Sequence, residues 1–460
     1  MGLIRSLSPQ RPDDVVATVP EATAADVEKA AEVAGTAQRE WWSALPAVRA
    51  AALSAAAATL RSRAAEATDL VVREVGKPAG EAAGEVARGI AILEYYAQAS
   101  YAPVGAALPP SMAGLLYTER RPHGIAGLVT PWNFPVAIPL WKAAPALAAG
   151  NAVLLKPSPE ATATAAWLGE LLAEHLPDGL FHVLPGGAPT GEAVLAAADV
   201  VSFTGSAGVG RRVAVAAAGR GVPVQAEMGG QNAAIVLPDA DAAVAARQLA
   251  AAAMGFAGQK CTATRRVIVV GPAARVREVT DALVAEVAAL PPGDPTRPGT
   301  AVGPVITAAA QRRVVDAAAA ATRAGGRLLH GGTVPELDGW YVTPTLVDGV
   351  DPGHAVAQEE TFGPLAVIQA APDVDAAVRL AEGVRYGLVT SVHGRDLAQL
   401  LAVVRGVQTG LVKVNAPTTG VDFWAPFGGE RDSSYGPREQ GQAALDFYAS
   451  SRTITLAPHP

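Results

Sequence analysis

The sequence predicts an α/β fold made of two domains in tandem, each with a mostly parallel sheet. The chain has 460 residues, of which 50% are hydrophobic and 17% charged, so it can bury two or three cores. From residue 124 onward, short apolar runs alternate with helical patterns, which is typical of βαβ units around a parallel sheet. The alternation occurs in two series, and these predict the two domains.

The first hundred residues predict mainly helices, because apolar residues recur there at helical spacing. We expect these helices over 23–37, 45–74 and 79–100. A loop follows, and then a strand over Leu115–Arg120. This part of the chain therefore precedes the regular alternation.

The first α/β series follows this loop. Strands are expected at Ile125–Thr130, Ala152–Leu155, Phe181–Leu184, Val200–Phe203 and Val222–Gln225. The helices between them are expected near 139–149, 160–175, 189–198 and 207–218. This order predicts a parallel sheet.

The second series has the same character. Its strands are expected at 232–236, 265–270, 365–369, 388–393 and 411–415, with helices at 240–256, 274–289, 305–323, 373–383 and 396–405. A short helix near 440–449 precedes a solitary strand, Arg452–Leu456. A solitary terminal strand usually pairs with another sheet, in this chain or in a partner.

Composition excludes several classes of protein. Lys plus Arg is 36 and Asp plus Glu is 43, a net charge of −7, which argues against a dedicated nucleic-acid binder. One cysteine excludes an internal disulfide framework, and the scattered histidines predict no metal site. No apolar window or leader predicts a membrane span or signal peptide, so we expect a cytoplasmic protein. The strong preference for Arg over Lys indicates a GC-rich, bacterial coding sequence.

The single cysteine is the first candidate for chemistry. Cys261 lies in GFAGQKCT, where glycines precede it and a polar threonine follows, as expected for a loop. An accessible thiol near a base can act as a nucleophile. A buried structural cysteine is the alternative, and this segment alone leaves both open.

Glu227 and Asn133 each follow a predicted strand, at the sheet edge where open α/β folds bind ligands. Glu227 precedes two glycines in QAEMGGQN. It is either a general base with a pKa raised by burial or a surface residue that caps a turn. Asn133 lies in TPWNFP, and its amide either stabilises an oxyanion or forms an Asx-turn.

Three further segments are candidates for cofactor binding. FTGSAGVG follows an apolar strand and opens a helix, a setting that binds pyrophosphate, although its spacing is not GxGxxG. Lys156 ends a strand and either contacts a ribose or stays solvated. Glu360 and Phe362, in QEETFGP, either hold a ribose and a ring or only turn the chain.

Together these segments resemble the aldehyde dehydrogenase superfamily over about residues 20–456. The matching motifs, in the family's order, are TPWNFP, LLKPS, FTGSAGVG, AEMGGQNA, GQKCTAT, QEETFGP, and APFGG followed by YGPREQG. Several agreeing motifs at these separations are far more specific than one. The segments GQKCTATRR, KVNAPTTGVDFWAPFGG and SSYGPREQG are most similar to α-ketoglutaric semialdehyde dehydrogenases, which oxidise 2,5-dioxopentanoate.

The resemblance implies an aldehyde dehydrogenase-like fold. A Rossmann-type dinucleotide-binding domain is implied over 1–103 and 123–228, and an α/β catalytic domain over 229–433. A β oligomerisation arm is implied over 104–122 and 446–460, and with it a homodimer or homotetramer. Because the chain starts late, we expect the N-terminal strands of many relatives to be missing.

The resemblance also implies the catalytic roles. Cys261 matches the nucleophile and Glu227 the general base. Asn133 matches the oxyanion-hole amide, which works with the backbone N–H of Cys261, and Glu439 matches a second carboxylate behind Glu227. Because Glu227 is present, the resemblance favours hydrolysis of the acyl-enzyme over transfer to coenzyme A.

The implied cofactor is NADP or NAD. The residues that match its contacts are Thr130, Pro131, Trp132, Lys156, Ser158, Gly205, Ser206, Val209, Gly210, Met228, Gly229, Glu360 and Phe362. NAD-preferring relatives carry an acid three positions after the lysine, where this chain has Pro159. A 2′-phosphate would meet less repulsion there and could bond to Ser158, so we expect NADP or dual use.

The implied substrate is a small semialdehyde such as 2,5-dioxopentanoate. Trp141 and Phe427 match positions that line the aldehyde tunnel, and Trp424 departs from the subgroup at its mouth. Arg265 is either an anchor for a substrate carboxylate or a surface ion pair. An aromatic or secondary-metabolite aldehyde is an alternative substrate, and a catalytically inactive relative is an alternative function.

Overall fold

The computed structural model describes residues 2–102 and 105–459. It begins with an antiparallel hairpin of β1 (Leu3–Ser8) and β2 (Arg11–Pro20). The expectation of missing N-terminal strands is therefore wrong. The inward side chains of β1 are Ile4, Ser6 and Ser8, so the strand carries almost no apolar alternation. Its inward serine at position 6 bonds to the buried Glu74 instead.

Four helices follow the hairpin: α1 (Ala24–Ser43), α2 (Pro46–Ser62), α3 (Ala64–Val75) and α4 (Ala79–Ala99). The single helix expected over 45–74 is divided between α2 and α3 at Arg63, whose φ of −106° and ψ of 19° leave the helical region. No glycine or proline marks this break, so periodicity alone continues across it. Gly76 ends α3 in the left-handed conformation.

The first large sheet confirms the parallel pattern. Its strands are β5 (Ile125–Val129), β6 (Ala152–Lys156), β7 (Phe181–Val183), β8 (Val200–Thr204) and β9 (Val224–Glu227), in the order β9-β8-β5-β6-β7. The order therefore reverses at β5. A two-residue strand from the end of the chain, β19 (Ser434–Tyr435), pairs antiparallel with β9. The connecting helices are α5 (Ala137–Ala148), η1 (Pro159–Ala161), α6 (Thr162–Ala173), α7 (Ala188–Ala197) and α8 (Ala207–Gly219).

The second large sheet has the order β12-β13-β14-β11-β10-β16-β17. Its predicted strands are β10 (Ala233–Val236), β11 (Arg266–Val270), β14 (Leu365–Ala371), β16 (Val389–His393) and β17 (Leu411–Val414). The sequence did not predict β12 (Arg327–His330), which pairs antiparallel, or β13 (Thr345–Asp348). Both are only four residues long, and β12 is a half-exposed edge strand, so neither gives a strong apolar pattern.

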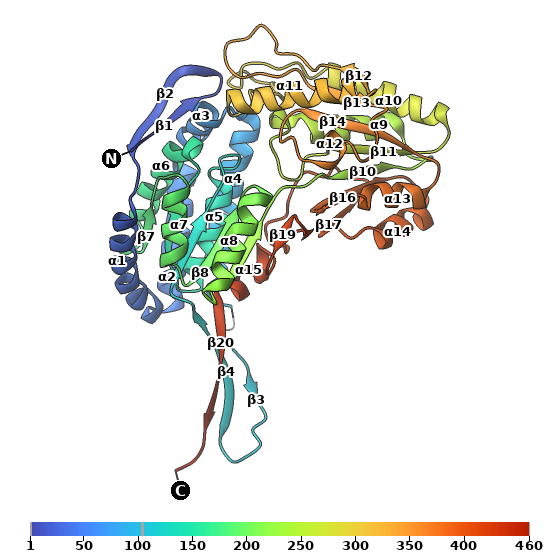
Figure 1. Cartoon of the computed structure of the whole chain (residues 1–460). Coiled ribbons are helices and arrows are strands. Elements are labelled where there is room, and N and C mark those ends of the chain that lie inside the picture. The colour runs from blue at the N-terminus through green and yellow to red at the C-terminus, as the bar shows by residue number, and fades with distance from the viewer. Residues whose placement is uncertain (1, 103–104, 460) are drawn as a thin grey trace.

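Helices lie on both faces of this second sheet (Figure 1), with α10 and α11 on one side and α13 and α14 on the other. The helices of this region are α9 (Ala242–Met254), η2 (Gly255–Gly258), α10 (Ala273–Ala288), α11 (Ala308–Arg323), α12 (Ala355–Gln358), α13 (Val374–Glu382) and α14 (Leu397–Gly406). A small pair, β15 (Tyr386–Gly387) and β18 (Glu430–Arg431), joins the last segments of the chain to this region.

A three-stranded arm extends from the body of the molecule (Figure 1). It consists of β20 (Ala449–Leu456), β4 (Leu115–Pro122) and β3 (Ala107–Leu108), in that order. The terminal strand is longer than predicted and pairs with β4 of its own chain. The boundary that we expect between residues 103 and 104 lies outside the described residues, as do the chain ends at 1 and 460.

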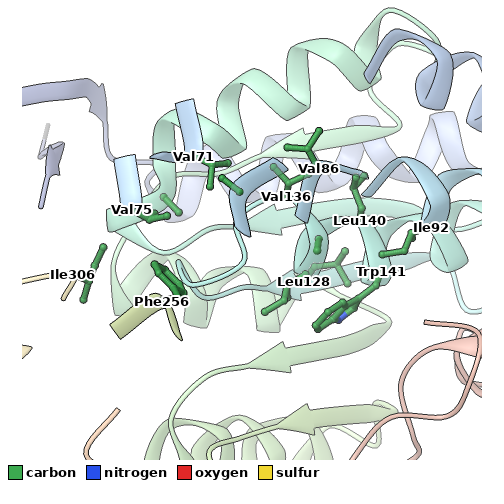
Figure 2. Close-up of a cluster of buried hydrophobic side chains, with 14 of the residues drawn as sticks. Val71, Val75, Val86, Ile92, Leu128, Val136, Leu140, Trp141, Phe256 and Ile306 are labelled. Atoms are coloured by element: carbon green, nitrogen blue, oxygen red, sulfur yellow. The ribbon is translucent and has the colours of Figure 1, made fainter. Parts of the chain in front are cut away.

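The apolar core connects the helical region to the second domain. Figure 2 shows Val71 and Val75 of α3 in one cluster with Leu128 of β5, Trp141 of α5 and Phe256 of η2. Helices α4 and α5 pack closely, since a Cβ added at Gly89 would lie 3.0 Å from the side chain of Leu140. The core therefore holds α5 rigidly between the first helices and the segment that leads to Cys261.

Within the described residues, no single helix has the length and apolar content to span a membrane. Among these residues, only α1 and α2 taken together have the necessary length and apolar content. The chain bends by 115° between the two helices. The same residues contain no group of three or more His, Cys, Asp or Glu side chains placed to hold a metal ion.

Candidate active site

Most of the predicted functional residues come together where two sheet edges face each other. The first sheet contributes the carboxyl ends of its strands: Asn133 follows β5, Lys156 ends β6 and Glu227 ends β9. Because the strand order reverses at β5, these ends border the crevice that binds nucleotides in open α/β sheets.

The second sheet contributes the amino ends of its strands. Asn232 precedes β10, Cys261 precedes β11 and Glu360 precedes β14. These strands are parallel neighbours, so their amino ends lie on one edge. A hydrogen bond of 3.0 Å from Asn133 Nδ2 to the carbonyl of Gln259 joins this edge to the first.

The loop that carries Cys261 begins with an unusual turn. Residues 256–258 have φ of 53°, 51° and 65°, and the first two are not glycine, so the turn stores backbone strain. Asn232 Nδ2 donates to the carbonyls of Cys261 at 2.8 Å and Ala263 at 2.9 Å. Cys261 is half-buried as a residue, and one side chain holds its loop at two carbonyls.

Burial raises the pKa of the Cys261 thiol to about 12, with further contributions from the negative charges of Glu360, Glu227 and Glu439. The backbone N–H of Thr262 acts in the opposite direction. The thiol is therefore protonated at neutral pH. It needs a base to become a nucleophile.

Asn133 is buried in the loop between β5 and α5. Its Nδ2 contacts the Gln259 carbonyl, so the amide binds the loop of Cys261 rather than forming an Asx-turn. An amide nitrogen carries two N–H groups. One of them therefore remains for an oxygen atom on the substrate.

Glu227 is buried and reaches across to the last segment of the chain. Its Oε2 accepts a hydrogen bond of 2.5 Å from Ser434, whereas Oε1 has no partner. Gly428 leaves room for this carboxylate, because a Cβ there would lie 2.7 Å from Oε1. Burial raises the pKa of Glu227 well above its usual range, and the negative charge of Glu439 adds to the shift.

Behind Glu227 lies a buried polar network that the sequence only half predicted. Glu439 forms an ion pair with Lys142 of α5, and Ser202 of β8 bonds to both. Oε2 of Glu439 has no partner. Glu439 is the expected second carboxylate, but its lysine partner was not singled out. The signal available was that Lys142 is one of only six lysines.

The glycine-rich segment after β8 forms the N-terminus of α8, as predicted. Ser206 is the N-cap residue, yet its hydroxyl makes no capping bond, so it remains available to an anion. A Cβ added at Gly205 would lie 2.5 Å from the ring of Phe203, and one at Gly210 would lie 2.5 Å from Met228 Sδ. Met228 thus packs beneath this turn. Val209 is exposed on the first turn of α8.

Lys156 is mostly buried at the end of β6, and burial lowers its pKa while the charges of Glu160 and Glu21 act against that shift. The next polar residue, Ser158, donates its hydroxyl to the carboxylate of Glu160. Position 159, where NAD-preferring relatives carry an acid, is a proline in this chain. The structure places the neighbouring acid, Glu160, beside Ser158 and Lys156.

Glu360 lies against the first sheet, since a Cβ at Gly229 would lie 1.8 Å from its Oε2. Its Oε1 is buried without a partner, and burial raises its pKa to about 7. Phe362 has a left-handed φ of 50° and packs edge-on against Trp132, with ring centroids 5.7 Å apart. Thr130 and Pro131 precede that tryptophan, and the Thr130 hydroxyl is also buried without a partner.

Arg265 differs from both expectations. Its side chain is only 2% exposed, so the surface ion pair is wrong. Its guanidinium donates to the carbonyls of Gly258 and Gly363, the latter at 2.5 Å. It therefore ties the loop before Cys261 to the loop after Glu360. Two of its nitrogens are already committed, which disfavours the role of substrate anchor.

Aromatic side chains gather near the expected tunnel. Trp141 of α5 packs on Phe427, with ring centroids 6.1 Å apart. A second row joins Tyr95 of α4 to Phe423 at 5.9 Å, and Phe423 to Trp424 at 4.9 Å, both edge-on. Trp424 is 57% exposed. It therefore lies at the surface of the molecule.

Comparison with known proteins agrees with this geometry. The chain matches the "Aldehyde dehydrogenase family" over residues 2–454. It is 36% identical to an α-ketoglutaric semialdehyde dehydrogenase of Bacillus subtilis (strain 168), over 99% of this chain and 95% of that protein. It is 38% identical to an α-ketoglutarate semialdehyde dehydrogenase of Haloferax volcanii, over 97% and 94%. The crystal structure of an NAD-dependent aldehyde dehydrogenase from Sinorhizobium meliloti has a TM-score of 0.95 and 32% identity, over 100% of this chain and 93% of that one.

Proposed function

Because the chain belongs to the aldehyde dehydrogenase family, and so is an oxidoreductase that acts on aldehydes, we propose that it converts an aldehyde to a carboxylic acid through a covalent adduct on Cys261. One observation carries this proposal. The thiol, the Asn133 amide and the unpartnered Oε1 of Glu227 converge where the two sheet edges meet. Such a set of nucleophile, oxyanion donor and base suits acyl chemistry.

The first step is attack of the Cys261 sulfur on the aldehyde carbonyl. The thiol proton leaves to a base, and Glu227 offers a free oxygen for it. The carbonyl oxygen then gains negative charge. The remaining N–H of Asn133 and the backbone N–H of Cys261 stabilise this charge, and one such donor is typically worth about 2.7–4 kcal/mol.

The residues at the two facing edges together fit a nicotinamide dinucleotide. Glu360 Oε1 is a buried acceptor without a partner, as a ribose hydroxyl requires, and the N-terminus of α8 is open to a pyrophosphate. When bound, the nicotinamide ring would accept a hydride from the sulfur adduct. Loss of that hydride leaves a thioester. Lys156, Gly205, Ser206 and Glu360 would hold the dinucleotide.

Hydrolysis of the thioester completes the reaction. After Glu227 has passed on the thiol proton, it removes a proton from water, and the resulting hydroxide attacks the acyl carbon. The C–S bond breaks, the acid is released, and the sulfur takes the proton from Glu227. A raised pKa suits a carboxylate that must accept a proton near neutral pH. The adjacent pair of Glu439 and Lys142 can take up the thiol proton before hydrolysis, because Glu439 Oε2 is unpartnered.

We propose NAD as the preferred cofactor, with NADP used less well. The sequence favoured NADP or dual use because position 159 is proline. The contacts now favour NAD, since the Ser158 hydroxyl already bonds to the Glu160 carboxylate, whose charge acts on Lys156. A 2′-phosphate there would meet a like charge.

The substrate class follows from relatives and contacts together. The two curated relatives are named for α-ketoglutarate semialdehyde, which supports 2,5-dioxopentanoate. The aromatic row of Tyr95, Phe423 and Trp424 favours instead an aldehyde with an apolar or aromatic body. A panel of 2,5-dioxopentanoate, succinate semialdehyde and benzaldehyde separates the two: the highest kcat/KM on benzaldehyde would reject the acidic substrate.

We also propose a homodimer or homotetramer assembled through the arm. Strand β20 lies at the edge of its sheet, and Leu115, Leu456 and Met112 are about half exposed there. An exposed apolar edge strand is prone to pair with another chain. Deletion of residues 450–460 should give monomers by light scattering, and an unchanged oligomer would contradict this assignment.

The decisive test of the proposed function is aldehyde oxidation by the purified chain. Wild-type protein should reduce NAD in the presence of an aldehyde, and Cys261→Ser should lose this activity while it keeps the wild-type melting temperature. Absence of aldehyde oxidation in the wild type would favour the inactive relative. Undiminished oxidation by Cys261→Ser would refute the mechanism.

A further inference from the structure

We propose that the buried ion pair of Lys77 and Glu85 positions the Asn133 amide against the loop of Cys261. This inference rests on the proposed function, since it concerns the oxyanion site of that reaction. Both side chains are 0% exposed, and their charged groups contact each other. Neither is placed at the reacting atoms, so their role is to position other residues.

Glu85 fixes the start of α5. Its Oε1 accepts hydrogen bonds from the backbone N–H groups of Val136, at 2.8 Å, and Ala137, at 3.0 Å. These are unpaired donors at a helix N-terminus, where a carboxylate also meets the positive end of the helix dipole. Asn133 lies only three residues before Val136. The carboxylate therefore determines where the loop of Asn133 enters the helix.

Lys77 contacts both halves of the oxyanion site. Its Nζ lies 3.7 Å from the ring centroid of Phe134 and 4.7 Å from that of Phe256, distances at which a cation is attracted to an aromatic face. Phe134 directly follows Asn133. Phe256 opens the left-handed turn that leads to Gln259, whose carbonyl accepts from Asn133.

One ammonium group thus connects the loop of the oxyanion donor to the loop of the nucleophile. Because both partners are buried, water cannot replace either one. A buried ion pair is weak evidence for added stability, since apolar residues of similar volume often serve as well. Because it lies between two catalytic loops, the ion pair fixes the position of one loop relative to the other.

Glu74 offers a matched control within the same chain. It is also buried, and its carboxylate accepts from the N–H groups of Ala163 and Thr164, both at 2.7 Å, at the start of α6. It has no contact with the loops of Asn133 or Cys261. Loss of its charge should therefore weaken the start of a helix, as loss of Glu85 does, but leave the oxyanion site intact.

The test compares Glu85→Gln, Lys77→Met and Glu74→Gln in the full-length enzyme without cofactor. Hydrolysis of p-nitrophenyl acetate requires both thiol and oxyanion donors, whereas alkylation of Cys261 by iodoacetamide requires only the thiol. A displacement of 1 Å in a catalytic group can cost about a hundredfold in rate. We expect Glu85→Gln and Lys77→Met to lower kcat for the ester about 10–100-fold, with little change in KM.

In the same two variants, the alkylation rate should stay within about twofold of wild type, because the thiol itself is not altered. Glu74→Gln should keep both rates while its melting temperature falls. The proposal is overturned if Glu85→Gln or Lys77→Met hydrolyses ester no more slowly than Glu74→Gln, or if alkylation falls in parallel with hydrolysis. Should Glu85→Gln not fold, Lys77→Met carries the test. Failure of the wild type to oxidise aldehydes would instead refute the proposed function.

Discussion

The two sheet edges that form the site are built in different ways. At the carboxyl edge, Asn133, Lys156 and Glu227 stand at or just after strand ends, so regular secondary structure places them. At the amino edge, Cys261 lies in an irregular loop held by the side chains of Asn232 and Arg265. The first edge thus presents its functional groups directly, whereas the second depends on buried side chains that hold backbone carbonyls.

The largest expected effect tests the direct role of the carboxyl edge. Asn133→Ala removes an oxyanion donor and should lower kcat for aldehyde oxidation about 10²–10³-fold. The fold should change little, because the strand and helix on either side remain. Steady-state kinetics and a melting curve measure the two effects. A loss of less than threefold would mean that the carboxyl edge does not contact the reacting oxygen.

The amino edge is tested by the pH dependence of the thiol. Its pKa is raised to about 12 by burial and by Glu360, Glu227 and Glu439. Below that pKa the reactive thiolate increases tenfold with each pH unit, so alkylation of the cofactor-free enzyme by iodoacetamide should become about a hundredfold faster from pH 7 to pH 9. A plateau below pH 9 would show that the thiol is not held in its neutral form.

Two adjacent arginines at the amino edge differ in whether their charge acts on the thiol. Arg265 and Arg266 are both buried and both donate to backbone carbonyls. Only the charge of Arg265 acts on the thiol and on Glu360. Arg265→Met and Arg266→Met should each destabilise the fold by about 1–3 kcal/mol, the cost of unpaired buried carbonyls.

The functional outcomes of this pair should differ. The cation at 265 favours the thiolate, so Arg265→Met should alkylate several-fold more slowly at pH 8. Arg266→Met should alkylate at the wild-type rate. Equal alkylation rates in the two variants would contradict the assigned role of Arg265.

Sequence reasoning was most successful at the carboxyl edge for a physical reason. Strand ends, glycines and prolines are local signals, and they placed Asn133, Glu227 and the turn at Gly205. The partners that orient these groups come from far along the chain. Ser434 lies 207 residues from Glu227, and Lys142 lies 297 residues from Glu439, so no local pattern could reveal either contact.

The amino edge and the N-terminal hairpin were predicted less well. Arg265 looked like a surface residue because charged side chains are rarely buried unless paired. Its partners are main-chain carbonyls of glycines, which carry no side-chain signal. The inward face of β1 likewise displays two serines and only one apolar residue, Ile4. In both places, hydrogen bonds replace the hydrophobic periodicity on which sequence interpretation depends.

The smallest expected effect returns to the carboxyl edge. Glu160→Gln removes the negative charge beside Ser158 and Lys156, so kcat/KM for NADP relative to NAD should rise about fivefold, as expected for one partly solvated charge pair. Parallel assays with the two cofactors measure the ratio. A ratio unchanged by the substitution, or a wild type that already prefers NADP, would remove Glu160 from cofactor selection.

The return of the chain end to the first sheet has a consequence for synthesis. Ser434 and Glu439 complete the surroundings of Glu227, yet they emerge from the ribosome long after Cys261. At about 5–20 residues per second, roughly ten to thirty-five seconds separate the thiol from its last neighbours. A nascent chain that has not yet reached residue 439 thus carries the sulfur without its completed pocket.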